Sequence, residues 1–79
     1  MKKLENQDPL LIDSLKAFVD ENRVSIALLQ RIFLIGFPRA ARIIDQLEEL
    51  GFVTYDIDAE KRKLLITENE LNDIIANME

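Results

Sequence analysis

Apolar residues recur along the chain in four segments with helical spacing and two segments with strand-like alternation. The first segment opens at Asp8-Pro9, where Asp is a favoured N-cap and Pro is tolerated at the first helical position. The spacing after it predicts a helix that ends near Asn22 and buries one face. That face consists of Leu11, Leu15, Phe18 and Val19.

Two further helices are predicted on either side of Gly36. Ser25 is a suitable N-cap for a short helix over 26–33. A third helix is predicted from about Pro38 to Leu50, and Gly51 fits the left-handed position that follows many helices. A four-residue connection with Gly inside it, set between two helices, is typical of a helix-turn-helix motif.

The remaining segments predict a hairpin and a fourth helix. Residues 52–57 and 62–66 alternate with period two around a polar turn, which indicates two strands. Thr67-Glu68-Asn69-Glu70 is a capping box before an apolar stripe that ends at Met78. The sequence therefore predicts a mainly α protein with a small β-hairpin: a single winged helix-turn-helix domain over 1–79, with an extra C-terminal helix. That helix packs on the domain itself or forms a homodimer through residues 67–79, and the sequence favours neither.

Length and composition exclude several classes of protein. The chain has 79 residues, which suits one domain, and 48% hydrophobic with 32% charged residues is a globular balance. It has no Cys and no His, and no nucleophile–base pair is visible, so we expect no enzyme, no metal and no cofactor. No apolar run reaches the roughly 18–20 residues that span a bilayer, and residues 1–8 lack the apolar stretch of a signal peptide. A cytoplasmic location is predicted.

The net charge of −5 argues against DNA binding, but the charge is unevenly distributed. Residues 1–22 carry −2, residues 23–63 carry +1, and residues 64–79 carry −4. The least acidic part is therefore the part that would hold a DNA-reading surface. Affinity from phosphate contacts is expected to be limited, because that contribution grows with the number of Lys and Arg residues engaged.

The candidate DNA-reading residues lie on the third helix and the hairpin. Arg39, Arg42 and Gln46 are three and four residues apart, so they share one exposed helix face. The major groove of B-DNA is roughly 12 Å wide and admits one helix, and Arg donates two parallel hydrogen bonds to guanine. Phosphate or minor-groove contacts are expected from three basic residues of the hairpin: Lys61, Arg62 and Lys63.

Each of these features also has a purely structural explanation. Exposed arginines are often only solvated, and nearby acids are potential partners for them: Asp45, Glu48 and Glu49. The basic run at 61–63 is, taken alone, more often a solvated turn. A second class of function therefore stays open, namely a winged-helix protein-interaction or dimerisation module with little DNA affinity.

Three segments resemble a known family: Asp8-Pro9-Leu10, Leu29-Gln30-Arg31 and the run from Ile35 to Glu48. They resemble the gamma domain at the C-terminus of FtsK/SpoIIIE-type bacterial DNA translocases, over roughly residues 8–66. The resemblance implies a winged helix that recognises short, G-rich, directional sites in double-stranded DNA during chromosome segregation. It also implies DNA contacts from five residues: Arg39 and Arg42 on the third helix, Gln30 and Arg31 on the second, and Arg62 on the wing.

Three positions depart from the family pattern. The family usually has Tyr followed by Asn, Thr or Ser where this chain has Phe37 and Pro38, and Arg where it has Leu34. The family's exact site preference is therefore not carried over. The chain also lacks a phosphate-binding Gly-Lys-Ser/Thr loop and is not itself a motor. Met1 and the extra helix favour a stand-alone relative over an excised domain.

Overall fold

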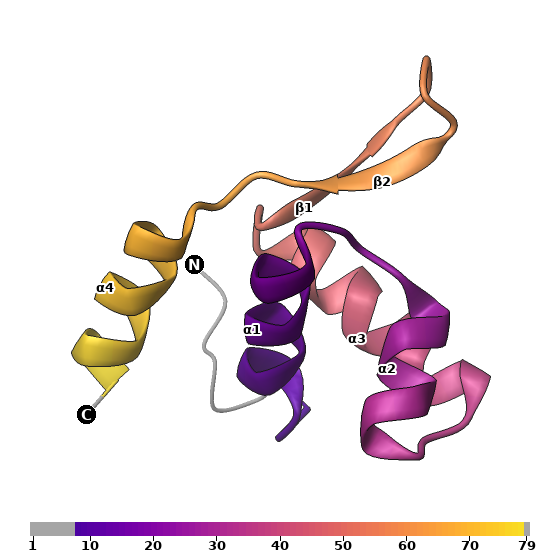
Figure 1. The fold of residues 1–79 in the computed structure, drawn as a ribbon, viewed down its shortest axis with the longest axis horizontal. Coiled ribbons are helices and arrows are strands. Elements are labelled where there is room, and N and C mark those ends of the chain that lie inside the picture. Colours follow the sequence, from indigo (N-terminus) through magenta and orange to yellow (C-terminus); the bar gives the residue numbers. More distant parts are fainter. Residues whose placement is uncertain (1–7, 79) are drawn as a thin grey trace.

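A computed structural model describes residues 8–78, and the expectations for residues 1–7 lie outside that range. The described residues form four helices and one antiparallel hairpin, which confirms the predicted fold class (Figure 1). In chain order the elements are α1 (Leu11–Glu21), α2 (Ile26–Phe33), α3 (Phe37–Glu49), β1 (Val53–Asp56), β2 (Lys61–Leu64) and α4 (Glu68–Met78).

The core lies where α3 packs against both α1 and α2. Each predicted apolar face contributes to it, because residues three and four apart project from the same side of a helix. The buried apolar residues are Leu11, Leu15, Phe18, Leu28, Leu29, Ala40, Ile43, Ile44, Leu47, Val53 and Leu71. The candidate DNA-reading side chains lie on the opposite face of α3, away from this core.

The first helix begins later than the sequence predicts. Leu10 is the residue at the N-cap of α1, and its side chain makes no capping hydrogen bond. Asp8 instead forms a turn before the helix. Its carboxylate Oδ1 accepts a hydrogen bond from the Leu10 N–H at 2.8 Å, and its carbonyl accepts one from the Leu11 N–H at 2.9 Å. The N-cap prediction for Asp8 was therefore wrong by two residues, because the same side-chain bond also closes a turn outside a helix.

The connection between α2 and α3 spans three residues, 34–36, where the sequence predicted four. The residue with left-handed backbone in this connection is Leu34 and not Gly36. Ser25 caps α2 as predicted, since its Oγ accepts a hydrogen bond from the Leu28 N–H at 3.1 Å. The C-cap residue after α2 is Leu34, whose φ of 54° is left-handed and uncommon for a residue with a side chain. Gly36 has φ −78°, which any residue adopts, whereas Gly51 after α3 has φ +86° and suits glycine.

The wing formed by β1 and β2 is shorter than predicted. The Oδ1 of Asp56 accepts hydrogen bonds from the N–H groups of Asp58 at 3.0 Å and Ala59 at 3.2 Å. These bonds start the turn early, so Ile57 lies in the turn and not in a strand. Lys61 belongs to β2, opposite Asp56, and not to the turn.

The last helix, α4, begins at the predicted capping box and packs on α1. The Thr67 N–H donates to Oε1 of Glu70 at 2.9 Å, and the Glu70 N–H donates to Oγ1 of Thr67 at 3.2 Å. Leu71 is 4% exposed and belongs to the core, against which Ile75 also packs. Figure 1 shows α4 on the side of α1 opposite α2. Of the two uses predicted for this stripe, packing on its own domain is confirmed, and the homodimer stays a prediction.

Candidate nucleic-acid interface

The exposed face of α3 holds the three residues predicted to read DNA from this helix. Arg39 and Arg42 are exposed in its first two turns, and Gln46 is half-buried one turn further on. No side chain caps the N-terminus of α3 at Gly36. The first N–H groups of a helix and its dipole give this end a partial positive charge, which favours an anionic ligand such as a DNA phosphate.

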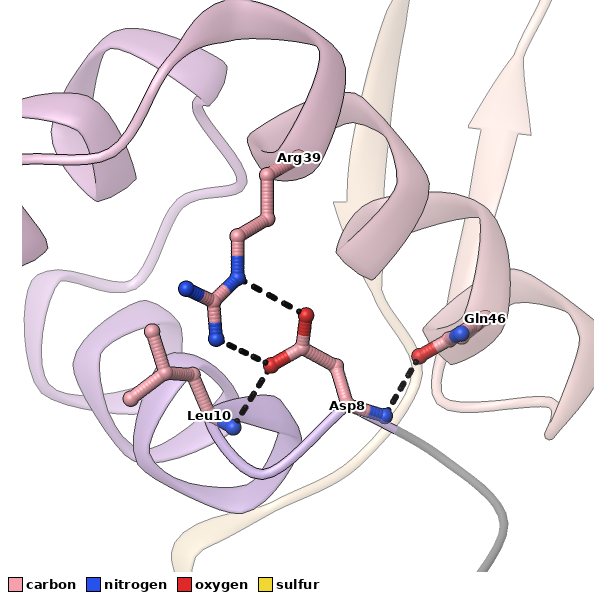
Figure 2. A network of polar contacts seen from close by, with 4 residues as sticks. All are labelled: Asp8, Leu10, Arg39 and Gln46. Atoms are coloured by element: carbon pink, nitrogen blue, oxygen red, sulfur yellow. Dashed lines mark hydrogen bonds and ion pairs between the residues drawn. The ribbon is translucent and has the colours of Figure 1, made fainter.

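Asp8 lies across this face and binds two of the three residues (Figure 2). The Arg39 guanidinium donates from Nε to Oδ2 at 3.0 Å and from Nη2 to Oδ1 at 2.9 Å. The Asp8 N–H donates to Oε1 of Gln46 at 3.2 Å. The segment before α1 is thus attached to α3 at two points, through its side chain and through its backbone.

Asp8 and Arg39 each stabilise the charged form of the other. The hydrogen bond from Arg39 lowers the pKa of the Asp8 carboxyl below its ordinary value, although burial opposes the shift. The bond from the Leu10 N–H and the positive charges of Arg39 and Arg42 lower it further. The same hydrogen bond raises the pKa of the Arg39 guanidinium. Both groups are therefore charged at neutral pH, and the field of Arg42 reaches the same carboxylate.

Sequence reasoning missed the partner of Arg39. It proposed acids on the same helix, and it assigned Asp8 to helix capping. The pair joins residues 31 positions apart, so it cannot be predicted from the spacing of residues within one helix or turn. The only available signal was the position of Asp8 within a segment that resembles the family.

The surface beside the N-terminus of α3 is apolar as well as basic. Of the two α2 residues for which the resemblance implies DNA contacts, Arg31 is exposed in the last turn and Gln30 is half-buried. Three large apolar residues are exposed around the neighbouring turn: Ile32 in the last turn of α2, Leu34 in the turn itself at 89% exposure, and Phe37 at the start of α3. The segment that joins α2 to α3 therefore exposes apolar as well as basic side chains.

The basic residues of the wing lie along β2. Arg62 is half-buried and its Nε has no hydrogen-bond partner among the described residues, while Lys61 and Lys63 are exposed. Lys63 Nζ lies 3.8 Å from Oδ2 of Asp56. These residues belong to a groove of about 220 Å³ between β2 and the loop after α1, lined by Asn22, Arg23, Val24, Lys61, Arg62, Lys63 and Leu64.

This groove brings in a basic residue that the sequence did not single out. Arg23 lies in the loop after α1, where its Nε is 3.8 Å from Oε1 of Glu21. The fold places it beside the basic residues of β2, so four basic side chains line one groove. Such a groove suits an anion such as a phosphate.

Over residues 8–78, no group of three acidic side chains is placed to hold a metal ion. None of the helices in that range combines the length and the apolar character that a membrane crossing needs.

The geometry is that of a small winged helix-turn-helix domain with an arginine-bearing second helix in its motif. The chain matches the family model of the Ftsk gamma domain over residues 5–67. It is 39% identical over 71 residues, 90% of its length, to DNA translocase FtsK of Caldanaerobacter subterraneus subsp. tengcongensis. It is 40% identical over 67 residues, 85% of its length, to DNA translocase FtsK of Clostridium tetani.

A third relative is DNA translocase SftA of Bacillus subtilis, which is 37% identical over 68 residues, 86% of the chain. The chain belongs to the FtsK gamma domain family, as its resemblance predicted. It spans 10%, 9% and 7% of the lengths of these three translocases.

Proposed function

We propose that this domain binds double-stranded DNA and reads short G-rich sites through α3. The observation that supports this proposal is the exposure of Arg39 and Arg42 in the first two turns of α3, directly after the short turn from α2. In a helix-turn-helix, the second helix enters the major groove and its N-terminal residues reach the base edges. Membership of a family found in DNA translocases supports the same function.

The arginines supply base recognition, and other basic residues supply phosphate contacts. A guanidinium recognises guanine by donating to O6 and N7 together. The supporting contacts come from Gln30 and Arg31 on α2, Gln46 on α3, and Lys61, Arg62 and Lys63 on the wing. Arg23 joins the wing residues through the groove that they share. Each phosphate that is neutralised makes the slope of log affinity against log salt concentration more negative by about 0.9.

The test is a titration of labelled G-rich and random duplexes at several salt concentrations. Arg39→Ala and Arg42→Ala should each weaken binding to the preferred duplex by roughly 5- to 150-fold, the effect of losing one bidentate guanine contact. Lys16→Ala is the matched control, since Lys16 is an exposed cation of α1 paired with Asp13. The proposal fails if both arginine variants bind as tightly as the parent.

A second candidate function is a protein-interaction module, and the apolar turn favours it. Ile32, Leu34 and Phe37 are exposed from the end of α2 to the start of α3, and exposed apolar patches often mark protein-interaction sites. This function predicts no binding to any duplex at low salt, together with a self-associated species in sedimentation experiments. Leu34→Ser should then dissociate that species, because it removes the most exposed apolar side chain of the patch.

The remaining parts of the proposal concern the setting of the domain. We infer that residues 1–79 form one folding unit that recognises DNA for a translocase in the bacterial cytoplasm, without catalysis or a cofactor of its own. A role in chromosome segregation belongs to the same proposal, because the resemblance to FtsK-type translocases implies it. A hydrolysis assay with ATP and duplex DNA tests the non-catalytic part, and turnover by the purified domain would contradict it.

A further inference from the structure

Asp8 engages only one edge of the Arg39 guanidinium. Arginine has five N–H donors in a rigid planar fork, and Asp8 accepts from Nε and Nη2. The outer edge, made of Nη1 and the second N–H of Nη2, makes no contact with Asp8, and Figure 2 shows Nη1 directed away from the carboxylate. The Arg39 side chain is 44% exposed while that of Asp8 is 16% exposed. The pair is therefore covered on the aspartate side and open on the arginine side.

We propose that Asp8 is a positioning residue for base recognition, which sets the plane of Arg39 so that its outer edge meets one guanine. This inference rests on the proposed function. Reading guanine needs two parallel donors directed at O6 and N7. A guanidinium already held in one plane presents those donors without first being ordered by the DNA, and prior ordering of a flexible side chain favours binding.

Asp8 is itself held firmly enough to orient another side chain. Its Oδ1 accepts from the Leu10 N–H at 2.8 Å, and its carbonyl accepts from the Leu11 N–H at 2.9 Å, which ties it to the start of α1. Its own N–H donates to Oε1 of Gln46 on α3 at 3.2 Å. The carboxylate is thus fixed relative to both α1 and α3. Because Arg39 donates two hydrogen bonds to it, the plane of the guanidinium is fixed as well.

The alternative action of Asp8 is to compete with DNA for Arg39. A competing carboxylate would cover the donors that guanine needs, yet the outer edge of Arg39 is not covered by Asp8 and the side chain is substantially exposed. Competition and positioning also predict different effects of removing the Asp8 carboxylate on DNA binding. Removing a competitor raises affinity for the preferred site, whereas removing a positioning residue lowers the preference for guanine at the one base pair that Arg39 reads.

The experiment measures base discrimination, because removing any negative charge raises the affinity for DNA phosphates in general. A preferred duplex is selected with the parent protein from a random pool, and each of its guanines is replaced in turn by adenine. The parent should lose roughly 5- to 150-fold in affinity at the position read by Arg39. Asp8→Asn should bring that ratio close to one and leave the ratios at the other positions unchanged.

Two variants control for charge and for folding. Asp13→Asn removes the same charge from an exposed position on α1 and should change none of the ratios. Asp8→Glu keeps the charge but displaces the carboxylate by one methylene, so it should lower the ratio at the same position even if Asp8→Asn does not fold. Arg39→Ala identifies the base pair that Arg39 reads, because this variant loses the preference for guanine there. Adding Asp8→Asn to Arg39→Ala should not change the affinity ratio at that base pair any further.

The outcomes separate this inference from the proposed function. The inference is overturned if Arg39→Ala abolishes discrimination at one position while Asp8→Asn and Asp8→Glu preserve it. It is also overturned if Asp8→Asn raises affinity for the preferred duplex more than for random DNA, which is the result of competition. If neither Arg39→Ala nor Arg42→Ala weakens binding, the proposed function fails and this inference fails with it.

Discussion

Replacing Leu71 by alanine tests how α4 is held on the domain. Leu71 is the one residue of α4 that is buried, at 4% exposure, and Ile75 beside it is only half-buried. The contact of α4 with α1 therefore depends strongly on a single side chain. Truncating Leu71 leaves the helix backbone and its capping box intact, so the effect reports the packing between the two helices.

The size of the effect follows from the burial of the side chain. A buried Leu→Ala change usually costs about 2–5 kcal/mol, and the low end applies where neighbours can close the space. Because α4 lies at the edge of the domain, we expect a cost of about 2–3 kcal/mol. A domain of 79 residues typically has about 4–12 kcal/mol of stability, and the melting temperature should fall by roughly 10–20 °C.

The assay is urea and thermal unfolding followed by circular dichroism at several protein concentrations. Asn72→Ala is the matched control on the exposed side of α4 and should change stability by less than about 0.5 kcal/mol. The reasoning is refuted if Leu71→Ala unfolds at the same urea concentration as the parent. A melting temperature of the parent that rises with its concentration would instead indicate that the domain self-associates.

Other predictions concern local backbone features and pH. Thr67→Ala should cost about 0.5–2 kcal/mol in urea unfolding, because the Glu70 N–H loses its acceptor; an unchanged midpoint would contradict this. Gly51→Ala should cost about 1 kcal/mol because of its φ of +86°, although a Cβ there meets nothing within 4 Å. Gly36→Ala should cost less than Gly51→Ala, because its φ is −78° and the nearest atom lies at 3.6 Å, so only the poorer N-cap preference of Ala opposes it. Thermal melts that rank the two variants in the opposite order would count against this account. Asp8→Asn should destabilise the protein at neutral pH, because it removes the ion pair with Arg39. The pKa of Asp8 is lowered from 3.8, so the difference in unfolding free energy between parent and variant should persist down to about that pH. It should then vanish as the pH falls through the lowered pKa of Asp8. Urea unfolding from neutral pH to about pH 2 measures that difference, and a constant difference would show that the ion pair does not stabilise the fold.

Several local features of the fold could be predicted from the sequence. The cap at Ser25 and the capping box at Thr67 were predictable because a side chain there bonds an N–H three residues away. The buried helix faces follow from the period of 3.6 residues. The ends of the hairpin and the start of α1 were misplaced. The side chains of Asp56 and Asp8 each close a turn with the N–H two residues on, and the alternation of apolar residues does not record such bonds.

The candidate site also has a part that could be predicted from the sequence and a part that could not. The sequence by itself determined that Arg39 and Arg42 share one face of the second helix of a helix-turn-helix, because residues three apart on a helix are neighbours. Only the tertiary structure decided that Asp8 binds Arg39 and that Arg23 lies beside the wing. These contacts join segments that are far apart in the chain. Their formation depends on how α1, α3 and the hairpin pack, and no local spacing of residues encodes that arrangement.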